Sequence, residues 1–229
     1  MNPLVSVVVV TYNRAHFLKE ALDSIQRQTF KDYEIIVVDD GSTDNTKEIV
    51  EQYKGIRYIY QEHGGISKAR NTAVKAAKGK WIATLDSDDL WKEQKLQKQM
   101  DYLQAHPDCR IVYTTFTSFS NIPEATLDER QKELLDTIIK WYLPSALVDA
   151  RLFDEIGMFD ENLTYSEDTE WNLRLKLLGI NRNHCIDEPL YLRRVHDSNI
   201  TNEQKRFSSL DLQNLVINAY RNIRKLREQ

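Results

Sequence analysis

Cysteine is scarce in this sequence, and long apolar runs are missing. The two cysteines, Cys109 and Cys185, form neither a Cys-x-x-Cys motif nor a spacing typical of zinc ligands, which argues against a zinc site and a disulfide framework. No apolar run reaches the roughly 20 residues that a membrane-spanning helix needs. Met1–Leu4 leads into the first apolar run without the basic segment and cleavage site of a signal peptide. We therefore expect a cytoplasmic protein.

An excess of positive charge is also missing. The 229 residues include 31 Lys and Arg against 35 Asp and Glu, so the net charge is −4 and the pI is about 5.8. A nucleic-acid-binding protein needs a clearly basic face, and this composition gives no sign of one. With 41% hydrophobic residues and no repeat or low-complexity linker, the chain is expected to form a single domain over residues 1–229.

Short apolar runs rich in β-branched residues recur along the first half and predict buried strands. These runs are Val5–Tyr12, Tyr33–Val38, Ile56–Tyr60, Trp81–Leu85 and Ile111–Phe116. The segments between them, at about 15–28, 49–53, 64–77 and 96–103, carry apolar or small residues on one helical face. This alternation predicts an α/β fold with a doubly wound, mostly parallel sheet and helices on both of its faces.

After Phe119 the alternation stops. Residues 120–140 are polar and acidic, and short helices are predicted around 152–156 and from about 165 to 178. Pro189–Val195 has the pattern of an edge strand. From Phe207 onward, apolar residues at helical spacing predict a terminal amphipathic helix over about 207–229.

The most distinctive segment is Trp81–Asp89, in which an apolar run ends at three carboxylates within four positions. A buried strand would place these acids at its carboxyl end, the edge of an open α/β sheet where ligands bind. Clustered carboxylates repel one another, and a hard divalent cation held together with substrate phosphates would relieve that repulsion. A solvated acidic turn before a helix near Glu93 explains this segment alone equally well. A second acidic strand end, Asp39-Asp40-Gly41-Ser42, favours the ligand site.

Six motifs occur in the order found in a known family. They are Val7–Arg14, Val37–Asp44, Ala69–Asn71, Leu85–Asp89, Ser166–Asp168 and Val195-His196. Together they resemble family 2 glycosyltransferases of the GT-A fold, over about residues 4–200. The resemblance implies a metal-dependent, inverting transferase that uses a nucleotide-diphosphate sugar, with a UDP-type donor favoured. Residues 1–119 would form the donor half and residues 120–206 a smaller acceptor half.

The resemblance also implies a role for individual residues. The implied nucleotide-sugar site comprises Thr11, Asn13, Arg14, Asp39, Asp40, Arg70, Asp86 and Ser87. The implied Mn²⁺ or Mg²⁺ site comprises Asp86, Asp88, Asp89 and His196. A carboxylate such as Asp39 can accept the imide proton of uracil, which agrees with its implied role. Arg70 could equally be a surface ion-pair member, and a lone histidine such as His196 is as often structural.

Asp168 falls where inverting members of the family keep the catalytic base. A positioned carboxylate can remove the proton of an acceptor hydroxyl in the transition state, so the implied role is chemically reasonable. The alternative is that Glu167 and Asp168 are simply acids at the start of a helix, where the helix dipole favours them.

Two features of the family's polymer-forming members are missing. There is no Gln-x-x-Arg-Trp after the Glu-Asp motif, and the sequence has no membrane spans. These features favour a transferase that adds one sugar per encounter with its acceptor. The acceptor would be a glycan or a lipid-linked sugar, recognised by about residues 120–165.

For the terminal helix, packing on the domain or on a second subunit is favoured over peripheral contact with the inner membrane face. Four basic residues keep the membrane alternative open: Arg221, Arg224, Lys225 and Arg227.

Three other classes of protein compete with this interpretation. A phospho-receiver module also places acids after a buried strand, but no lysine follows the strand Ile111–Phe116. A nucleotidyltransferase would need a Gly- and Arg-rich loop after its first strand, where this chain has Thr11–Arg14. A sugar-nucleotide-binding domain without catalytic activity remains the third alternative.

Overall fold

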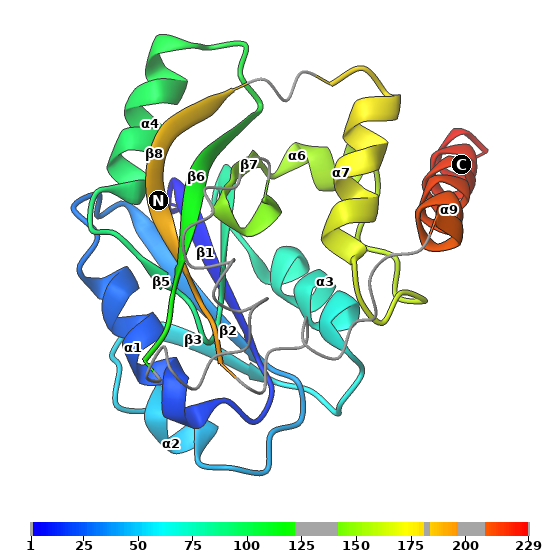
Figure 1. Ribbon diagram of the computed structural model, residues 1–229. Helices are drawn as coiled ribbons and strands as arrows, with labels where there is room; N and C mark the ends of the chain where they lie inside the picture. The colour runs from blue at the N-terminus through cyan, green and yellow to red at the C-terminus, as the bar shows by residue number, and fades with distance from the viewer. Residues whose placement is uncertain (1, 122–141, 181–183, 197–208, 229) are drawn as a thin grey trace.

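The structure is a computed structural model that describes residues 2–121, 142–180, 184–196 and 209–228, and within the last range the side chains of residues 214–226 and 228. It is built on an eight-stranded sheet in the order β3-β2-β1-β4-β7-β6-β8-β5 (Figure 1). The strands are β1 (Val5–Thr11), β2 (Tyr33–Asp39), β3 (Ile56–Tyr60), β4 (Trp81–Asp86), β5 (Leu90–Trp91), β6 (Ile111–Phe119), β7 (Leu147–Asp149) and β8 (Cys185–Arg194). The helices are α1 (Ala15–Gln26), α2 (Thr46–Val50), α3 (Ile66–Ala76), α4 (Lys95–Ala105), the 3₁₀ turn η2 (Leu143–Ser145), α6 (Arg151–Glu155), α7 (Glu167–Leu177) and α9 (Ser209–Arg227).

The first four strands confirm the predicted doubly wound arrangement. β1 pairs in parallel with β2 on one side and with β4 on the other, and β3 pairs in parallel with β2. β7 runs antiparallel between β4 and β6, and β5 runs antiparallel to β8. The sequence did not predict β5 or β7, because strands of two and three residues carry no readable periodicity.

The predicted edge strand Pro189–Val195 needs correction. It belongs to β8, which begins earlier, at Cys185, and lies between β6 and β5 instead of at the edge. The short strand β5 occupies the edge and pairs with Tyr191 and Leu192 of β8. Pro189 lies at an irregularity in the pairing of β6 with β8, where a proline is tolerated away from a sheet edge. Part of the predicted acceptor-recognition segment, residues 122–141, lies outside the described residues.

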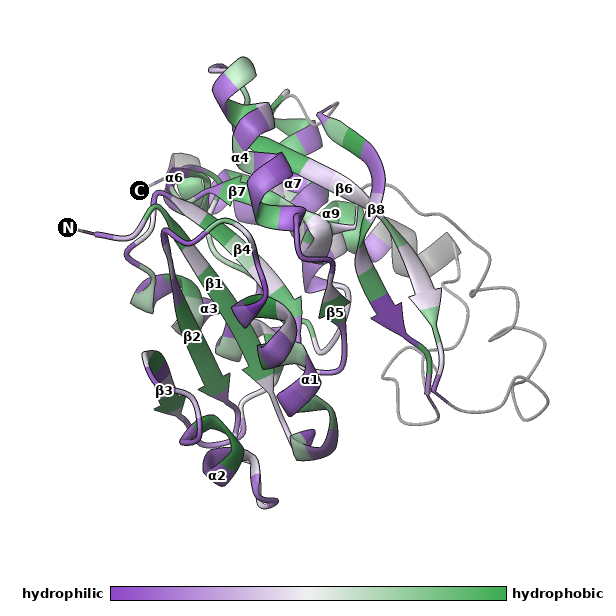
Figure 2. Ribbon diagram, turned by 90° about the vertical axis from the view of Figure 1, so that its left-hand side faces the viewer, coloured by the Kyte–Doolittle hydropathy of each residue, from purple (hydrophilic) through white to green (hydrophobic). Residues whose placement is uncertain are grey.

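Alternate residues of the central strands pack into two hydrophobic cores, one on each face of the sheet. On β1, Val5, Val7 and Val9 belong to the core that contains residues of α1, α2 and α4. Val8 belongs to the core that contains residues of α3, α6 and α7. The central strands are accordingly the most apolar part of the ribbon in Figure 2. Helices therefore cover both faces, which explains why β1 is apolar on both sides.

The terminal helix α9 packs on α7, on the side of α7 that faces away from the sheet (Figure 1). Its inward residues Leu215, Ala219 and Ile223 are buried. The Asn222 amide donates to Glu170 of α7 at 3.1 Å, which fixes the helix in place with a polar contact as well. The helix therefore packs on its own domain, which is one of the two packing roles predicted for it. None of the helices described has an apolar stretch long enough to cross a bilayer.

Lys95, in the first turn of α4, is fully buried. Its Nζ donates to the Gln99 side-chain oxygen at 3.0 Å and lies 4.2 Å from the centre of the Trp91 ring. Within the described residues, no carboxylate stabilises the charge of this ammonium. Burial removes it from water and lowers its pKa to about 7, so the protonated form is unfavourable in the folded protein.

We expect Lys95→Met to be more stable than the wild type at pH 6, by about 3 kcal/mol. The substitution removes a desolvation cost of about 5 kcal/mol, and the Gln99 oxygen left without its donor offsets about 1–2 kcal/mol of that gain. Because the folded pKa is lowered, unfolding takes up a proton between about pH 7 and pH 10. The wild type should therefore gain stability as the pH rises through that window, and the variant should not.

Urea unfolding at pH 6 and pH 9.5 measures both effects. Lys98→Met is the matched control, because it removes a partly exposed lysine of the same helix, and neither effect is expected there. Equal stability of Lys95→Met and the wild type at pH 6 would contradict the prediction.

Candidate active site

The carboxyl ends of β1, β2 and β4 bring the predicted nucleotide-binding residues together. Thr11 is in register with Asp39 on β2, and Asp86 ends the neighbouring strand β4. Just beyond β1, Asn13 adopts a left-handed backbone conformation with φ 51°, and its side-chain oxygen accepts the Thr43 N–H at 2.8 Å. The loops after β1 and β2 are thus tied to each other at the edge of the sheet where ligands bind.

Two further predicted residues flank this junction. The Thr11 side chain is buried, and its hydroxyl has no hydrogen-bond partner among the described residues. Arg14 immediately precedes α1, and its Nη1 lies 3.4 Å from the carbonyl oxygen of Asn13. A polar residue on either side of the strand end suits a nucleotide pocket, and both roles stay predictions.

Asp39 is buried and already hydrogen-bonded. Its Oδ1 accepts the Ser42 N–H at 2.8 Å, and its Oδ2 accepts the Tyr58 hydroxyl at 2.6 Å. Burial raises the pKa of Tyr58, and the neighbouring Asp39 carboxylate raises it further. A nucleotide base that formed a hydrogen bond with Asp39 would therefore either share the carboxylate with the Tyr58 hydroxyl or displace that hydroxyl.

Asp40 organises the start of α3. Its carboxylate accepts the N–H groups of Gly64 and Gly65, at 3.0 and 2.8 Å. The negative charge of Asp40 thus lies at the amino terminus of α3, where the helix dipole favours it. His63 Nδ1 lies 2.8 Å from the same carboxylate, and the His63 ring stacks on Tyr12 with 4.1 Å between ring centres. Asp40 therefore holds an aromatic pair beside the strand ends.

Arg70, on α3, joins the two halves of the chain. Its Nη2 donates to Asp86 Oδ1 at 2.9 Å, and its Nη1 donates to Glu167 at the start of α7. The other oxygen of Asp86 accepts the Tyr142 hydroxyl at 3.1 Å. Since Arg70 is only 4% exposed, it belongs to a buried ion-pair network and not to the surface.

Three carboxylates influence this one guanidinium. Burial disfavours the charge of Arg70, but Glu167 and Asp86 outweigh burial, and Asp168 adds to them, so its pKa is raised. Burial raises the pKa of Glu167 to about 6, against the opposite effect of Arg70. The Leu85–Asp89 motif and the Glu-Asp motif therefore form one electrostatic cluster around Arg70.

The Asp86–Asp89 turn places its carboxylates in different surroundings. Asp88 is partly exposed, and its Oδ2 lies 3.0 Å from His196 Nε2. Asp89 is 3% exposed; its Oδ2 accepts the Tyr191 hydroxyl at 2.6 Å and its Oδ1 accepts the Arg194 N–H at 2.7 Å. Burial raises the pKa of Asp89 well above its usual value, and the neighbouring carboxylates add to the rise. This geometry favours an anchoring role for Asp89 over metal ligation.

The remaining donors fit a metal ion that is shared with a substrate. Among the described residues, no three His, Cys, Asp or Glu side chains are grouped to hold a metal by themselves. Asp88 and His196 are adjacent, and Asp86 lies on the same turn. Mg²⁺-type ions are commonly held by one or two carboxylates and completed by substrate phosphates, so this partial donor set matches that use.

Asp168 lies in the first turn of α7 and is half-buried. One carboxylate oxygen accepts the Thr169 N–H at 2.7 Å. Within the described residues the other oxygen has no hydrogen-bond donor, which leaves it able to accept a proton. Ser166, just before the helix, has a left-handed conformation with φ 62°. Such strain at a non-glycine residue is often found beside functional groups.

Several residues of this site were not predicted as site residues. They are Tyr58, Tyr142, Glu167, Tyr191 and Arg194. Glu167 could have been suspected from its place beside Asp168 in the Glu-Asp motif. The others belong to no motif, and their role depends on contacts between segments far apart in the sequence.

A doubly wound sheet with an Asp-x-Asp turn after β4 and a buried arginine that links it to a Glu-Asp motif defines a glycosyltransferase domain of the GT-A type. The chain belongs to glycosyl transferase family 2: the family model matches residues 6–160. This confirms the family suggested by the motifs.

Known relatives agree with this assignment. The chain is 34% identical over 220 residues to EpsJ, an uncharacterized glycosyltransferase of Bacillus subtilis, covering 88% of this chain and 64% of EpsJ. It is 36% identical to an uncharacterized glycosyltransferase of Rickettsia typhi, covering 88% of this chain and 67% of the relative. TuaG of B. subtilis, provisionally assigned to teichuronic acid biosynthesis, is 38% identical over 120 residues, covering 50% of this chain and 47% of TuaG. The chain thus spans about two thirds of the length of the first two relatives.

Two solved structures share the fold. S. aureus TarS 1–349 in complex with UDP-GlcNAc has a TM-score of 0.76 at 24% identity, covering 97% of this chain and 66% of TarS 1–349. The mannosyltransferase PcManGT from Pyrobaculum calidifontis, in complex with GDP-Man and Mn²⁺, has a TM-score of 0.66 at 19% identity, covering 100% of this chain and 74% of PcManGT.

Proposed function

We propose that this domain transfers one sugar per encounter from a UDP-type nucleotide sugar to a hydroxyl group of a glycan or lipid-linked acceptor, with inversion at the anomeric carbon. The observation that carries the proposal is the Arg70 bridge. Through it, Asp86 of the donor motif contacts the same guanidinium as Glu167, the neighbour of Asp168. The contact supports the proposal because it links the proposed donor-binding group, through one side chain, to the neighbour of the proposed base, and a transfer reaction requires the two to be close.

In the proposed reaction, Asp168 accepts the proton of the acceptor hydroxyl while the acceptor oxygen bonds to the anomeric carbon. The bond between that carbon and the diphosphate breaks in the same displacement, and the nucleoside diphosphate leaves with the electron pair. Because the acceptor and the leaving group occupy opposite sides of the carbon, a single displacement inverts its configuration.

Asp88 and His196 would hold a divalent cation, Mn²⁺ or Mg²⁺, with Asp86 on the same turn. When bound, such an ion supplies positive charge to the departing diphosphate. The Mn²⁺ in the PcManGT complex supports this part of the proposal. The UDP-GlcNAc complex of TarS supports a UDP-type donor, and the name of TuaG supports a role in surface-polysaccharide synthesis.

The proposal is tested by incubating the protein with radiolabelled UDP-, GDP- and dTDP-sugars and Mn²⁺ and scoring release of the sugar. We expect turnover with a UDP-sugar. Nucleotide binding without turnover of any donor would instead identify a sugar-nucleotide-binding domain. A strong preference for GDP-sugars would overturn the donor assignment but not the reaction.

The metal dependence of nucleotide binding should disappear in Asp88→Asn. In the wild type we expect UDP to bind at least about tenfold more tightly with Mn²⁺ than with EDTA, because the carboxylates of the turn otherwise face the phosphates directly. Removing the Asp88 charge removes a ligand, so the two affinities should become similar. Calorimetry with UDP measures both. Asp101→Asn, at an exposed carboxylate on α4, is the control and should behave as the wild type. If the wild type binds UDP equally well with Mn²⁺ and with EDTA, the proposed metal site is excluded.

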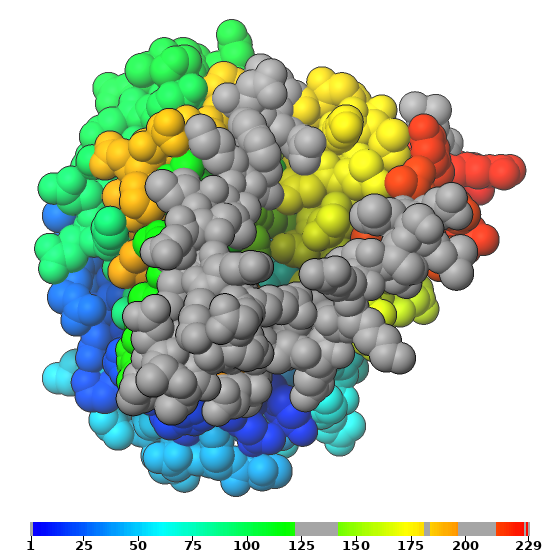
Figure 3. Space-filling view, in the orientation of Figure 1, coloured from blue at the N-terminus to red at the C-terminus, as the bar shows by residue number. Residues whose placement is uncertain are grey.

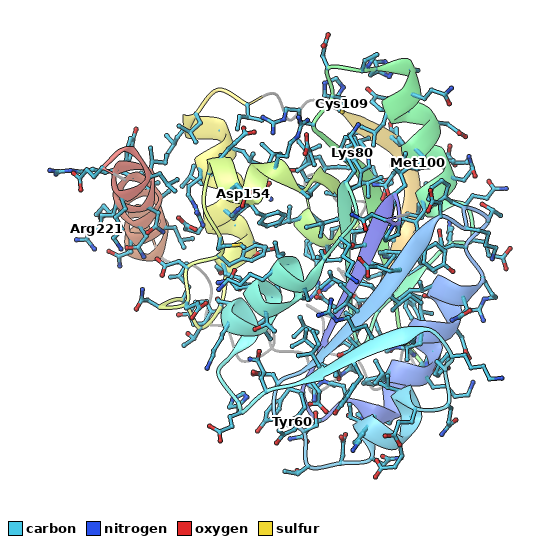
Figure 4. The ribbon with its side chains drawn as sticks, turned by 180° about the vertical axis from the view of Figure 1, so that it is seen from behind. Tyr60, Lys80, Met100, Cys109, Asp154 and Arg221 are labelled. Atoms are coloured by element: carbon cyan, nitrogen blue, oxygen red, sulfur yellow. The ribbon has the colours of Figure 1, made fainter. Side chains whose placement is uncertain are left out.

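The outer face of α9 could carry peripheral membrane contact. Val216, Ile217 and Tyr220 are 38%, 45% and 58% exposed. Arg221 lies on the side of the helix away from the sheet (Figure 4), and α9 is at the periphery of the molecule, red in Figure 3. An apolar strip beside exposed cations suits an anionic bilayer surface, as at the inner face of a membrane.

We therefore expect the protein to co-sediment with anionic lipid vesicles at low salt and to be released by added salt. Each cation near the surface contributes about 1 kcal/mol, so Arg221→Glu together with Arg224→Glu should weaken binding strongly. Lys19→Glu with Lys47→Glu makes the same charge change on α1 and α2 and should have little effect. If the wild type stays in the supernatant at low salt, α9 serves packing alone and a soluble acceptor is favoured.

A further inference from the structure

The residues that follow the Asp-x-Asp motif are attached to β8. Asp89 accepts hydrogen bonds from the Tyr191 hydroxyl and the Arg194 N–H, at 2.6 and 2.7 Å. Directly after it, β5 pairs with β8, with Trp91 opposite Tyr191. The turn that carries Asp88 is therefore fixed by its carboxyl-terminal side to the strand that leads to His196.

Arg194 adds a second connection. Its Nε donates to the backbone carbonyl of Asp88 at 2.8 Å, and its Nη2 lies 2.9 Å from Glu20 of α1. The guanidinium carbon is 4.9 Å from the ring centre of Phe17 and 4.7 Å from that of Phe119. Arg194 is 1% exposed, so α1, β6 and the turn all hold it in one position.

The two groups that would bind the cation lie at the ends of this arrangement. Asp88 belongs to the turn after β4, and His196 follows β8 by two residues. Their side chains meet at 3.0 Å, and the His196 ring also packs against Phe17, with 4.5 Å between ring centres. The same ring of α1 thus contacts both His196 and Arg194.

We propose that Tyr191 and Arg194, here called the β8 anchor, are positioning residues that keep Asp88 and His196 in the arrangement that binds the divalent cation. The inference rests on the proposed function. It assigns to Asp89 the task of receiving the anchor and not that of binding the ion. Groups that orient metal ligands typically change metal affinity by about 10- to 100-fold when they are removed.

The test measures Mn²⁺ binding directly, by the loss of the free Mn²⁺ signal in electron paramagnetic resonance, with and without UDP. Tyr191→Phe deletes only the hydroxyl that holds Asp89. We expect about a tenfold or greater loss of Mn²⁺ affinity. Tyr113→Phe is the matched control, because Tyr113 is also fully buried and its hydroxyl donates to Asn172 at 2.5 Å, outside the turn. It should lower thermal stability similarly but leave Mn²⁺ affinity within about twofold.

Arg194→Lys provides an independent variant. Lysine keeps the positive charge between the aromatic rings, but its single ammonium cannot reproduce the planar fork that reaches both Asp88 and Glu20. Arg194→Lys should also weaken Mn²⁺ binding by about tenfold relative to the wild type.

The possible outcomes separate this inference from the proposed function. Wild-type protein that binds no Mn²⁺, even with UDP, overturns the proposed metal site and the anchor with it. Wild-type binding together with unchanged affinity in Tyr191→Phe and Arg194→Lys overturns the anchor alone. Tighter Mn²⁺ binding in Tyr191→Phe would show that the released Asp89 is itself a ligand, which also overturns it.

Discussion

Asp168→Asn should reduce sugar transfer by about 10²-fold or more, while the affinity for UDP stays close to that of the wild type. The amide cannot accept the proton of the acceptor hydroxyl, so the loss falls on the chemical step and not on nucleotide binding. Single-turnover transfer with a radiolabelled UDP-sugar measures the rate, and calorimetry measures the affinity.

The competing explanation is that Asp168 only stabilises the start of α7. An acid in the first turn of a helix typically contributes about 0.3–1 kcal/mol through the helix dipole. Asp154→Asn is the matched control, since Asp154 lies in the first turn of α6 and is exposed. Both variants should lose a similar small amount of stability, but only Asp168→Asn should lose transfer. Near-normal transfer in Asp168→Asn would return this residue to the helix-start role.

Arg70→Met should lower the free energy of unfolding by about 3–5 kcal/mol and should also weaken the binding of UDP. The substitution leaves Asp86 and Glu167 near each other without the cation that separates them. Urea unfolding measures the first effect, and calorimetry with UDP and Mn²⁺ measures the second. Where Arg70→Met does not fold, Arg70→Lys keeps the charge but cannot contact both carboxylates at once, so it should bind UDP more weakly than the wild type.

A second buried arginine separates stability from function. Arg174 is 1% exposed and contacts Glu170 at 2.6 Å within α7. Arg174→Met should therefore be destabilised to a similar degree but should keep its affinity for UDP. If the two arginine variants lose UDP affinity equally, the effect of Arg70 is one of folding and its role at the donor site is refuted.

The sequence by itself determined the parallel strands β1 to β4 and which edge of the sheet is expected to bind ligands, but not the short strands β5 and β7. β-branched runs such as Val5–Tyr12 are apolar on both faces, and only a strand covered by helices on both sides satisfies them. The carboxylates at 39–40 and 86–89 come directly after such runs, so their place at the carboxyl edge follows from the local pattern. The ordered motifs then sufficed to identify the family, which the comparison with known relatives confirms.

Only the tertiary structure decided the surroundings of those carboxylates. Asp88 and Asp89 are neighbours in sequence with the same side chain, yet one is partly exposed beside His196 and the other is buried against Tyr191, which is 102 residues away. Likewise, Arg70 could be a surface residue by its sequence, and it is the contact with Glu167, 97 residues away, that makes it a buried bridge. Hydrophobic periodicity reports only which face of a local element is covered. The identity of the covering residue depends on how distant elements pack, so the sequence could not show that one end of the acidic turn contacts His196 while the other is buried against β8.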